Sequence, residues 1–257
     1  MLFEVTPSRW LAVNPDATTS RPVTANNWLG INWQIAQASG WGIFGMNLAR
    51  ELERNSPYQP VPLVPLSIDN LLTAQIQKEL EPLVRRGNTL LQLLQGNREG
   101  TLKADFPVLH SLGNEIHSKG MPLGESWNIE CTGSRNLAIV FFEDNVPNEH
   151  TRENCSKFDL VLGGSTWNKN ILHNFGIRNV DVLFQGVDPE LFKLQERKTS
   201  DRFVVFSGGK LEYRKGQDIV AAAFREFHKR HPEAMLATAW HNLWPEIMRD
   251  IFPSRSC

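Results

Sequence analysis

Short apolar runs alternate along this chain with longer segments in which apolar residues recur every three or four positions. The short runs are typical of buried parallel strands, and the longer periodic segments are typical of amphipathic helices. The expected strands cover residues 32–38, 106–109, 136–142, 158–164, 180–184, 203–206 and 234–240. The expected helices cover residues 46–54, 70–84, a segment that begins near 147, 165–174 and 216–230. This alternation predicts an α/β fold built on parallel sheets.

A polar, charged stretch at residues 193–202 interrupts the pattern and predicts a linker between two domains. We therefore expect a first Rossmann-like domain at residues 1–192 and the start of a second at residues 203–257. Prolines and many Ser, Thr and Asn residues in segment 1–31 predict irregular structure or short strands on the outside of the first domain.

Composition narrows the class of protein without identifying it. The 257 residues are 41% hydrophobic and 21% charged, with a formal net charge of -1, which is typical of a globular protein and gives no reason to expect a nucleic-acid partner. The three cysteines lack Cys-x-x-Cys spacing, so the sequence predicts no zinc site and fits a reducing cytoplasm. No apolar run is long enough to span a bilayer, although a lipid acceptor would allow peripheral membrane contact.

Three glycines follow the first expected strand. Gly40, Gly42 and Gly45 spell G-x-G-x-x-G, and we expect them to form a loop that joins this strand to a helix. In a dinucleotide-binding oxidoreductase an acidic residue follows about 20 positions later, and Asp69 is the candidate. Three prolines crowd the run before Asp69 and disfavour a central strand there. A tight turn without a ligand is a further interpretation of the glycines.

His110 is the candidate catalytic residue of the first domain. It follows the expected strand 106–109, and open α/β sheets bind ligands beyond the carboxyl ends of their strands. A single histidine is often only structural, and His117 competes for the role. The paired acids Glu143 and Asp144 either contact a ligand or cap the next helix.

The segment 203–216 has the pattern of a phosphate-binding loop. An apolar strand is followed by Gly208 and Gly209, which we expect to turn the chain, and then by Lys210 and Lys215 at the start of a helix. A helix N-terminus and nearby lysines both favour an anion. The simpler alternative is a solvated basic loop without a ligand.

This segment resembles the start of the second domain of retaining GT-B glycosyltransferases of the GT4 type, where a strand, a glycine and a cation are followed by a Lys-Gly pair. The stretch 158–192 adds to the resemblance, with Asp159 in a strand, Ser165 opening a helix, and Gly186-Val187-Asp188-Pro189 before a Phe. Although Gly, Asp and Pro favour turns on their own account, several pieces in this order are more specific than one tetrapeptide.

The resemblance implies a GT-B architecture and transfer of a sugar, with retention, from a nucleotide-sugar donor to a saccharide, lipid or protein acceptor. It implies no metal and no cofactor, because the nucleotide-sugar is itself a substrate. It assigns donor binding to Gly40, Gly42, Gly209, Lys210 and Lys215, and it assigns catalytic roles to Lys210, Lys215 and His110.

The chain departs from the family in its second domain, where 57 residues follow position 200, whereas about 100 to 200 would be expected. The family's paired glutamates are missing from this stretch, so we expect a truncated second domain. The alternatives that remain are an NAD(P)-dependent oxidoreductase and a non-catalytic remnant that binds an acceptor or partner.

Overall fold

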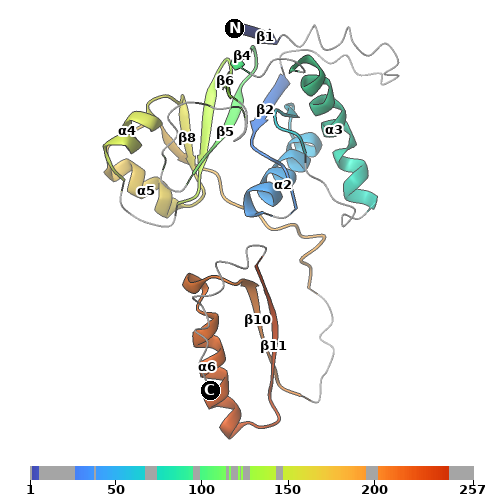
Figure 1. The fold of residues 1–257 in the computed structure, drawn as a ribbon, viewed down its shortest axis with the longest axis vertical. Coiled ribbons are helices and arrows are strands. Elements are labelled where there is room, and N and C mark those ends of the chain that lie inside the picture. The colour runs from blue at the N-terminus through green and yellow to red at the C-terminus, as the bar shows by residue number, and fades with distance from the viewer. Residues whose placement is uncertain are drawn as a thin grey trace. The chain divides into compact units, whose positions relative to one another are not determined.

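The computed structural model describes residues 2–5, 27–37, 39–66, 74–94, 99–113, 116, 121, 123, 128–142, 147–194 and 202–242. The chain divides into two compact units, Met1–Phe192 and Lys193–Cys257, and each is described by itself (Figure 1). This division falls at the residue where the sequence predicts the first domain to end. Among the described residues, no helix is both long and apolar enough to cross a membrane.

The first unit is built on a six-stranded sheet with the order β3-β2-β5-β7-β8-β9. All of its neighbouring strands pair in parallel. The strands are β2 (Trp28–Asn32), β3 (Gln59–Pro62), β5 (Val108–Leu112), β7 (Asn136–Val140), β8 (Leu160–Gly163) and β9 (Val180–Val182). The strand order reverses between β2 and β5, and such a switch point is where open α/β sheets bind ligands.

Helices cover both faces of this sheet, as expected for a parallel sheet (Figure 1). The helices are α2 (Gly40–Asn55), α3 (Ala74–Leu94), α4 (Glu149–Cys155) and α5 (Thr166–Asn174). Ile139 packs with the core under α2 and α3, whereas its neighbours Ala138 and Val140 pack with the core under α4 and α5. This alternation along β7 confirms a mixed α/β, Rossmann-like fold for the first unit.

A second, three-stranded parallel sheet lies in the same unit, with the order β1-β4-β6. Its strands are β1 (Leu2–Val5), β4 (Glu99–Ala104) and β6 (Asn128–Thr132). Buried residues of β4 and β6 share a core with Val61 and Val108 of the large sheet. The sequence did not indicate this sheet, because β1 lies in a segment with several prolines and β4 begins inside the polar stretch 96–100, which has a glycine at each end.

The first expected strand is displaced. We expected it at 32–38, but β2 ends at Asn32 and is an inner strand of the large sheet, so segment 1–31 is not confined to the outside. Gly30 interrupts the apolar run and hid the strand. A Cβ at Gly30 would lie 3.1 Å from Leu63 and Val108 side chains, so the tight packing of neighbouring strands accounts for the glycine.

Several other boundaries also differ. Helix α3 passes through Pro82 and continues to Leu94, beyond the expected end at residue 84. Strand β5 runs two residues beyond His110. β3 carries Pro60 and Pro62 at the edge of the sheet, a position where proline is tolerated. Asp69, His117 and residues 143–145 lie outside the described residues.

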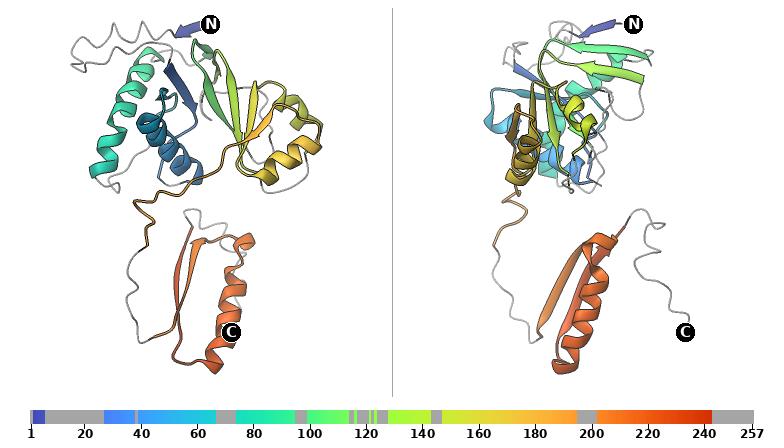
Figure 2. Two further views of the ribbon diagram at one scale, coloured as in Figure 1. Left: turned by 180° about the vertical axis from the view of Figure 1, so that it is seen from behind. Right: turned by 90° about the vertical axis from the view of Figure 1, so that its left-hand side faces the viewer.

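The second unit is a single β-α-β arrangement. Strand β10 (Val204–Lys210) pairs in parallel with β11 (Met235–His241), and helix α6 (Gln217–Arg230) connects them and packs along one face (Figure 2). A short 3-10 helix, η2 (Tyr213–Lys215), precedes α6. The predicted helix and the last predicted strand are confirmed to within one residue, but Gly208 and Gly209 belong to β10 rather than to a turn.

Candidate functional site

The candidate site of the second unit is the connection from β10 to α6. Lys210 is the last residue of β10, Lys215 ends η2, and Gly216 leads directly into the first turn of α6. Gly216 has a left-handed backbone (φ 65°, ψ 32°), which glycine adopts without strain. Two lysines therefore lie in the connection that ends at the positive end of a 14-residue helix.

Buried amide side chains hold the backbone of this connection. The Gln217 side chain, 3% exposed, donates from Nε2 to the Lys210 carbonyl over 2.8 Å. Asn242, also buried, donates from Nδ2 to the Leu211 carbonyl over 2.6 Å. The Gln217 Oε1 atom is buried and accepts no hydrogen bond from any residue in the described part of the chain. These two amides fix the backbone on both sides of the end of β10.

Glu212 lies among the cations of the connection. Its carboxylate is 2.7 Å from Lys210 Nζ and 2.9 Å from Arg214 Nε, and its side chain is only 16% exposed. The hydrogen bond from Lys210 lowers the pKa of Glu212, and the charges of Arg214 and Lys215 lower it further. Glu212 is therefore ionised at neutral pH and is the anion that these cations hold in the structure.

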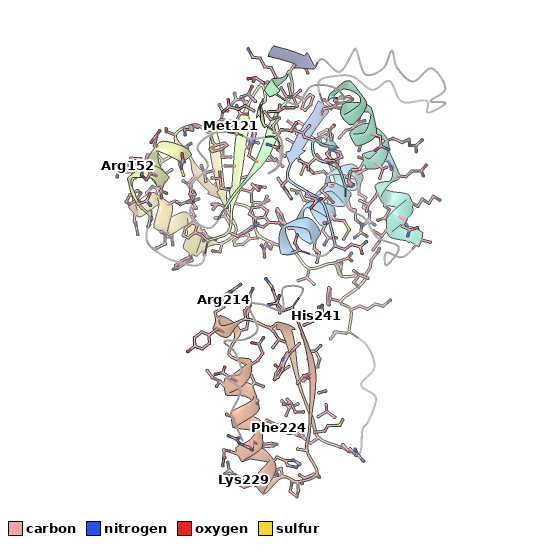
Figure 3. The ribbon with its side chains drawn as sticks, in the orientation of Figure 1. Met121, Arg152, Arg214, Phe224, Lys229 and His241 are labelled. Carbon is pink, nitrogen blue, oxygen red and sulfur yellow. The ribbon has the colours of Figure 1, made fainter. Side chains whose placement is uncertain are left out.

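Figure 3 shows Arg214 and His241 at one end of the second unit and Lys229 at the other. His241 is exposed and pairs in register with Lys210 at the end of β11. The sequence pointed to Lys210 and Lys215 but missed Glu212, Gln217, His241 and Asn242. The signal for His241 and Asn242 was their place at the carboxyl end of a strand that is parallel to β10.

The structure does not support a catalytic role for His110. The expectation placed it after a strand, but it lies within β5, is 3% exposed and packs against the Phe158 ring. Its Nδ1 is 3.0 Å from Asn32 Nδ2, and its Nε2 is 3.1 Å from Asn136 Oδ1. These partners fit a neutral ring protonated on Nε2, which accepts from Asn32 and donates to Asn136. His110 thus links three strands, and a sugar could not reach it without repacking.

We expect His110 to make the protein sensitive to mild acid. Burial lowers the His110 pKa from its usual 6.5 to about 4. Between these values the unfolded chain binds a proton that the folded protein does not, so stability falls as the pH falls. The loss is about 2 kcal/mol between pH 7 and pH 5. Urea unfolding of the parent and of His110→Gln at both pH values measures this loss of stability, since glutamine does not titrate. Equal losses of stability in the two proteins would contradict a role for His110.

The glycines at the start of α2 do not form the expected loop. Helix α2 begins at Gly40, and the Gly42 amide donates to the N-cap Ser39 Oγ over 3.0 Å. A Cβ at Gly42 would lie 2.6 Å from the Ala36 nitrogen, and one at Gly45 would lie 2.6 Å from the Trp33 Nε1 atom. Packing against the preceding segment therefore accounts for Gly42 and Gly45 without a ligand. A Cβ at Gly40 meets nothing within 4 Å, so donor contact by Gly40 stays a prediction.

The Gly186–Pro189 motif is anchored to helix α2 by a buried ion pair. Asp188 Oδ2 is 2.7 Å from Nη1 of Arg50, which is on α2 and is 4% exposed. Arg50 Nε also contacts Glu79 of α3 over 2.8 Å. The other oxygen, Asp188 Oδ1, accepts from the Glu190 amide over 2.9 Å and so turns the chain. One carboxylate therefore both turns this segment and fastens it to α2.

The segment after β8 agrees with the prediction. Ser165 caps α5 by accepting from the Asn168 amide over 3.1 Å, and the chain leaves the helix at Gly176, which has a φ of 93°.

Comparisons of the chain with models of known protein families and with curated proteins found no match. The functional assignment therefore depends on the residues of the sites described above.

Proposed function

We propose that this chain carries the donor-phosphate site of a retaining glycosyltransferase of the GT-B type. In this proposal the second unit is the start of a nucleotide-sugar-binding domain, and Lys210 and Lys215 bind the diphosphate of the donor. The observation that carries the proposal is the placement of both lysines in the connection between the carboxyl end of β10 and the N-terminus of α6. Parallel α/β units bind phosphate at this position.

The chemistry follows from where charge develops. When the bond between the sugar and the diphosphate breaks, negative charge grows on the leaving phosphate oxygen. Lysine ammonium groups and the amides of a helix N-terminus stabilise that charge if they are already in place. Gln217 and Asn242 hold the backbone beside Lys210, which reduces the reorganisation that binding requires.

An exposed apolar face supports the view that the second unit is part of a larger domain. Parallel sheets are normally covered on both faces. Val204, Phe206 and Met235 point to the same side of the β10–β11 pair, and Phe206 is 71% exposed. In the proposed GT-B architecture, further elements of a complete nucleotide-binding domain would cover this face.

The oxidoreductase alternative loses its main support. The dinucleotide fingerprint needs glycines that let the backbone approach a pyrophosphate. Here residues 33–39 separate the end of β2 from α2, and the side of α2 with Gly42 and Gly45 faces this same segment. No specific observation therefore favours NAD(P) binding over a nucleotide-sugar.

Binding of nucleoside diphosphates to the full chain tests the proposal. We expect calorimetric titration with UDP, GDP and ADP to detect at least one ligand, and NADH to bind no better. Lys210→Ala and Lys215→Ala should each weaken that binding by about tenfold or more, because each removes a charge-assisted contact to phosphate.

Lys229→Ala is the matched control, since this exposed lysine lies at the other end of the unit and pairs with Glu226. We expect it to bind like the parent. Equal binding by the parent, Lys210→Ala and Lys215→Ala would show that the connection is only a solvated basic loop.

A further inference from the structure

The cations of the proposed phosphate site already have an anionic partner within the chain. Lys210 and Arg214, both exposed, contact the two different oxygens of Glu212. Glu212 is much less exposed than either cation, so its carboxylate lies beneath their charged groups. A phosphate that binds Lys210 and Arg214 would compete with this carboxylate for their charged groups.

The local backbone explains why the carboxylate lies there. Glu212 has an extended backbone (φ -147°, ψ 142°) immediately before η2, and its side chain does not cap that helix. Its carbonyl accepts from the Lys215 amide over 2.9 Å, and the neighbouring Leu211 carbonyl is held by Asn242. The backbone is thus fixed, whereas the carboxylate is held by the side chains of the cations and can rotate away when they find another anion.

We propose that Glu212 is an intramolecular competitor of the phosphate ligand, which must displace its carboxylate from Lys210 and Arg214 before it binds. This inference rests on the proposed function, because it concerns the ligand that Lys210 and Lys215 would take. The competing contact lowers the fraction of molecules that are ready to bind, and the apparent affinity falls by the same factor. A ligand then occupies the site only if its contacts release more free energy than is lost when the carboxylate leaves the cations. A diphosphate that also reaches Lys215 and the α6 amides is such a ligand.

Glu212→Gln removes the competing charge and keeps the size of the side chain. We expect it to bind inorganic pyrophosphate about tenfold more tightly than the parent, a change that two half-exposed ion pairs together can supply. Glu233→Gln is the matched control, because it changes the net charge equally but lies after the far end of α6, where Glu233 pairs with His231. It should bind pyrophosphate within about twofold of the parent.

A second measurement on the parent does not depend on the stability of any variant. The carboxyl carbon of Glu212, observed by NMR during a pH titration, should report a lowered pKa in the free protein. Saturating pyrophosphate should raise that pKa toward its usual value, because the cations then contact phosphate instead. A Glu212 carboxyl signal that titrates identically with and without bound pyrophosphate would overturn the inference.

The outcomes separate this inference from the proposed function. If the parent and Glu212→Gln bind pyrophosphate equally well, Glu212 does not compete, and the phosphate site stands without it. If neither binds pyrophosphate, both the inference and the proposed site are wrong. Binding by Glu212→Gln alone supports both, since it shows an anion site that the carboxylate keeps closed.

Discussion

Replacing Gly42 with alanine should destabilise the first unit by about 3 kcal/mol or more, which is one of the largest effects expected of any single methyl group in this chain. The new Cβ would lie 2.6 Å from the Ala36 nitrogen and closer still to the Ala36 carbonyl oxygen. These are backbone atoms, so no side-chain rotation relieves the clash. Helix α2 would have to move away from the segment that precedes it.

Gly40→Ala provides the control at the same end of the same helix. A Cβ at Gly40 meets nothing within 4 Å, and alanine is the better helix former, so we expect stability within about 1 kcal/mol of the parent. Thermal unfolding measures both variants, and the loss in Gly42→Ala corresponds to a Tm lower by roughly 6–12 °C for a unit of this size. Similar Tm values for the two variants would show that the close packing of Gly42 against Ala36 is not a constraint on the fold.

This pair of glycines shows where sequence reasoning reaches its limit. The G-x-G-x-x-G pattern correctly indicated that the backbone is approached closely at Gly42 and Gly45, but the approaching group is the chain itself rather than a ligand. A motif specifies that a side chain is missing and leaves open what fills the space. Only the path of residues 33–37, which run back past α2, decides between these interpretations.

Elements with strong local signals were predicted well. The cap at Ser165, the end of α5 at Gly176 and the helix after Gly216 each depend on a residue type that acts through its own backbone or side chain. The small β1-β4-β6 sheet and the position of β2 were missed, because pairing between distant segments determines them. His110 was misplaced for a related reason: the burial of its ring depends on Asn32, Asn136 and Phe158, which come from other strands and loops.

In the candidate site of the second unit, too, the sequence indicates some residues, and only the structure reveals the others. Lys210 and Lys215 stand out in the sequence because a strand, glycines and a helix start surround them. The roles of Gln217 and Asn242 are visible only once β10 and β11 lie side by side, because each amide reaches a carbonyl of the connection after β10. The acid Glu212 lies between the lysines in the sequence, but its contact with both Lys210 and Arg214 required the turn geometry of η2.

Arg50→Ala should also lower the free energy of unfolding by about 3 kcal/mol, because it leaves the carboxylate of Asp188 buried without its cation. Asp188 is 9% exposed, and Arg50 is the cation that links it to α2 and α3.

The pKa of Asp188 is lowered chiefly by its hydrogen bond from Arg50. A carboxylate whose folded pKa is lowered stabilises the protein at neutral pH, and this contribution disappears as the pH falls below its unfolded value. Arg50→Ala should therefore be less sensitive to acid below about pH 4 than the parent.

Arg54→Ala is the matched control, since Arg54 lies one turn further along α2 and contacts the same Glu79, but is exposed. We expect this variant to lower the free energy of unfolding by less than about 1 kcal/mol, as is usual for exposed ion pairs. A double-mutant cycle with Asp188→Asn isolates the Arg50 contact, because Oδ1 can still accept from Glu190 in that variant. If the stability loss of the double variant equals the sum of the losses of the two single variants, the ion pair does not stabilise the fold. A coupling of about 2 kcal/mol, with faster hydrogen exchange at Glu190 and Leu191 in Arg50→Ala, would establish that Arg50 fastens the Gly186–Pro189 segment to helix α2.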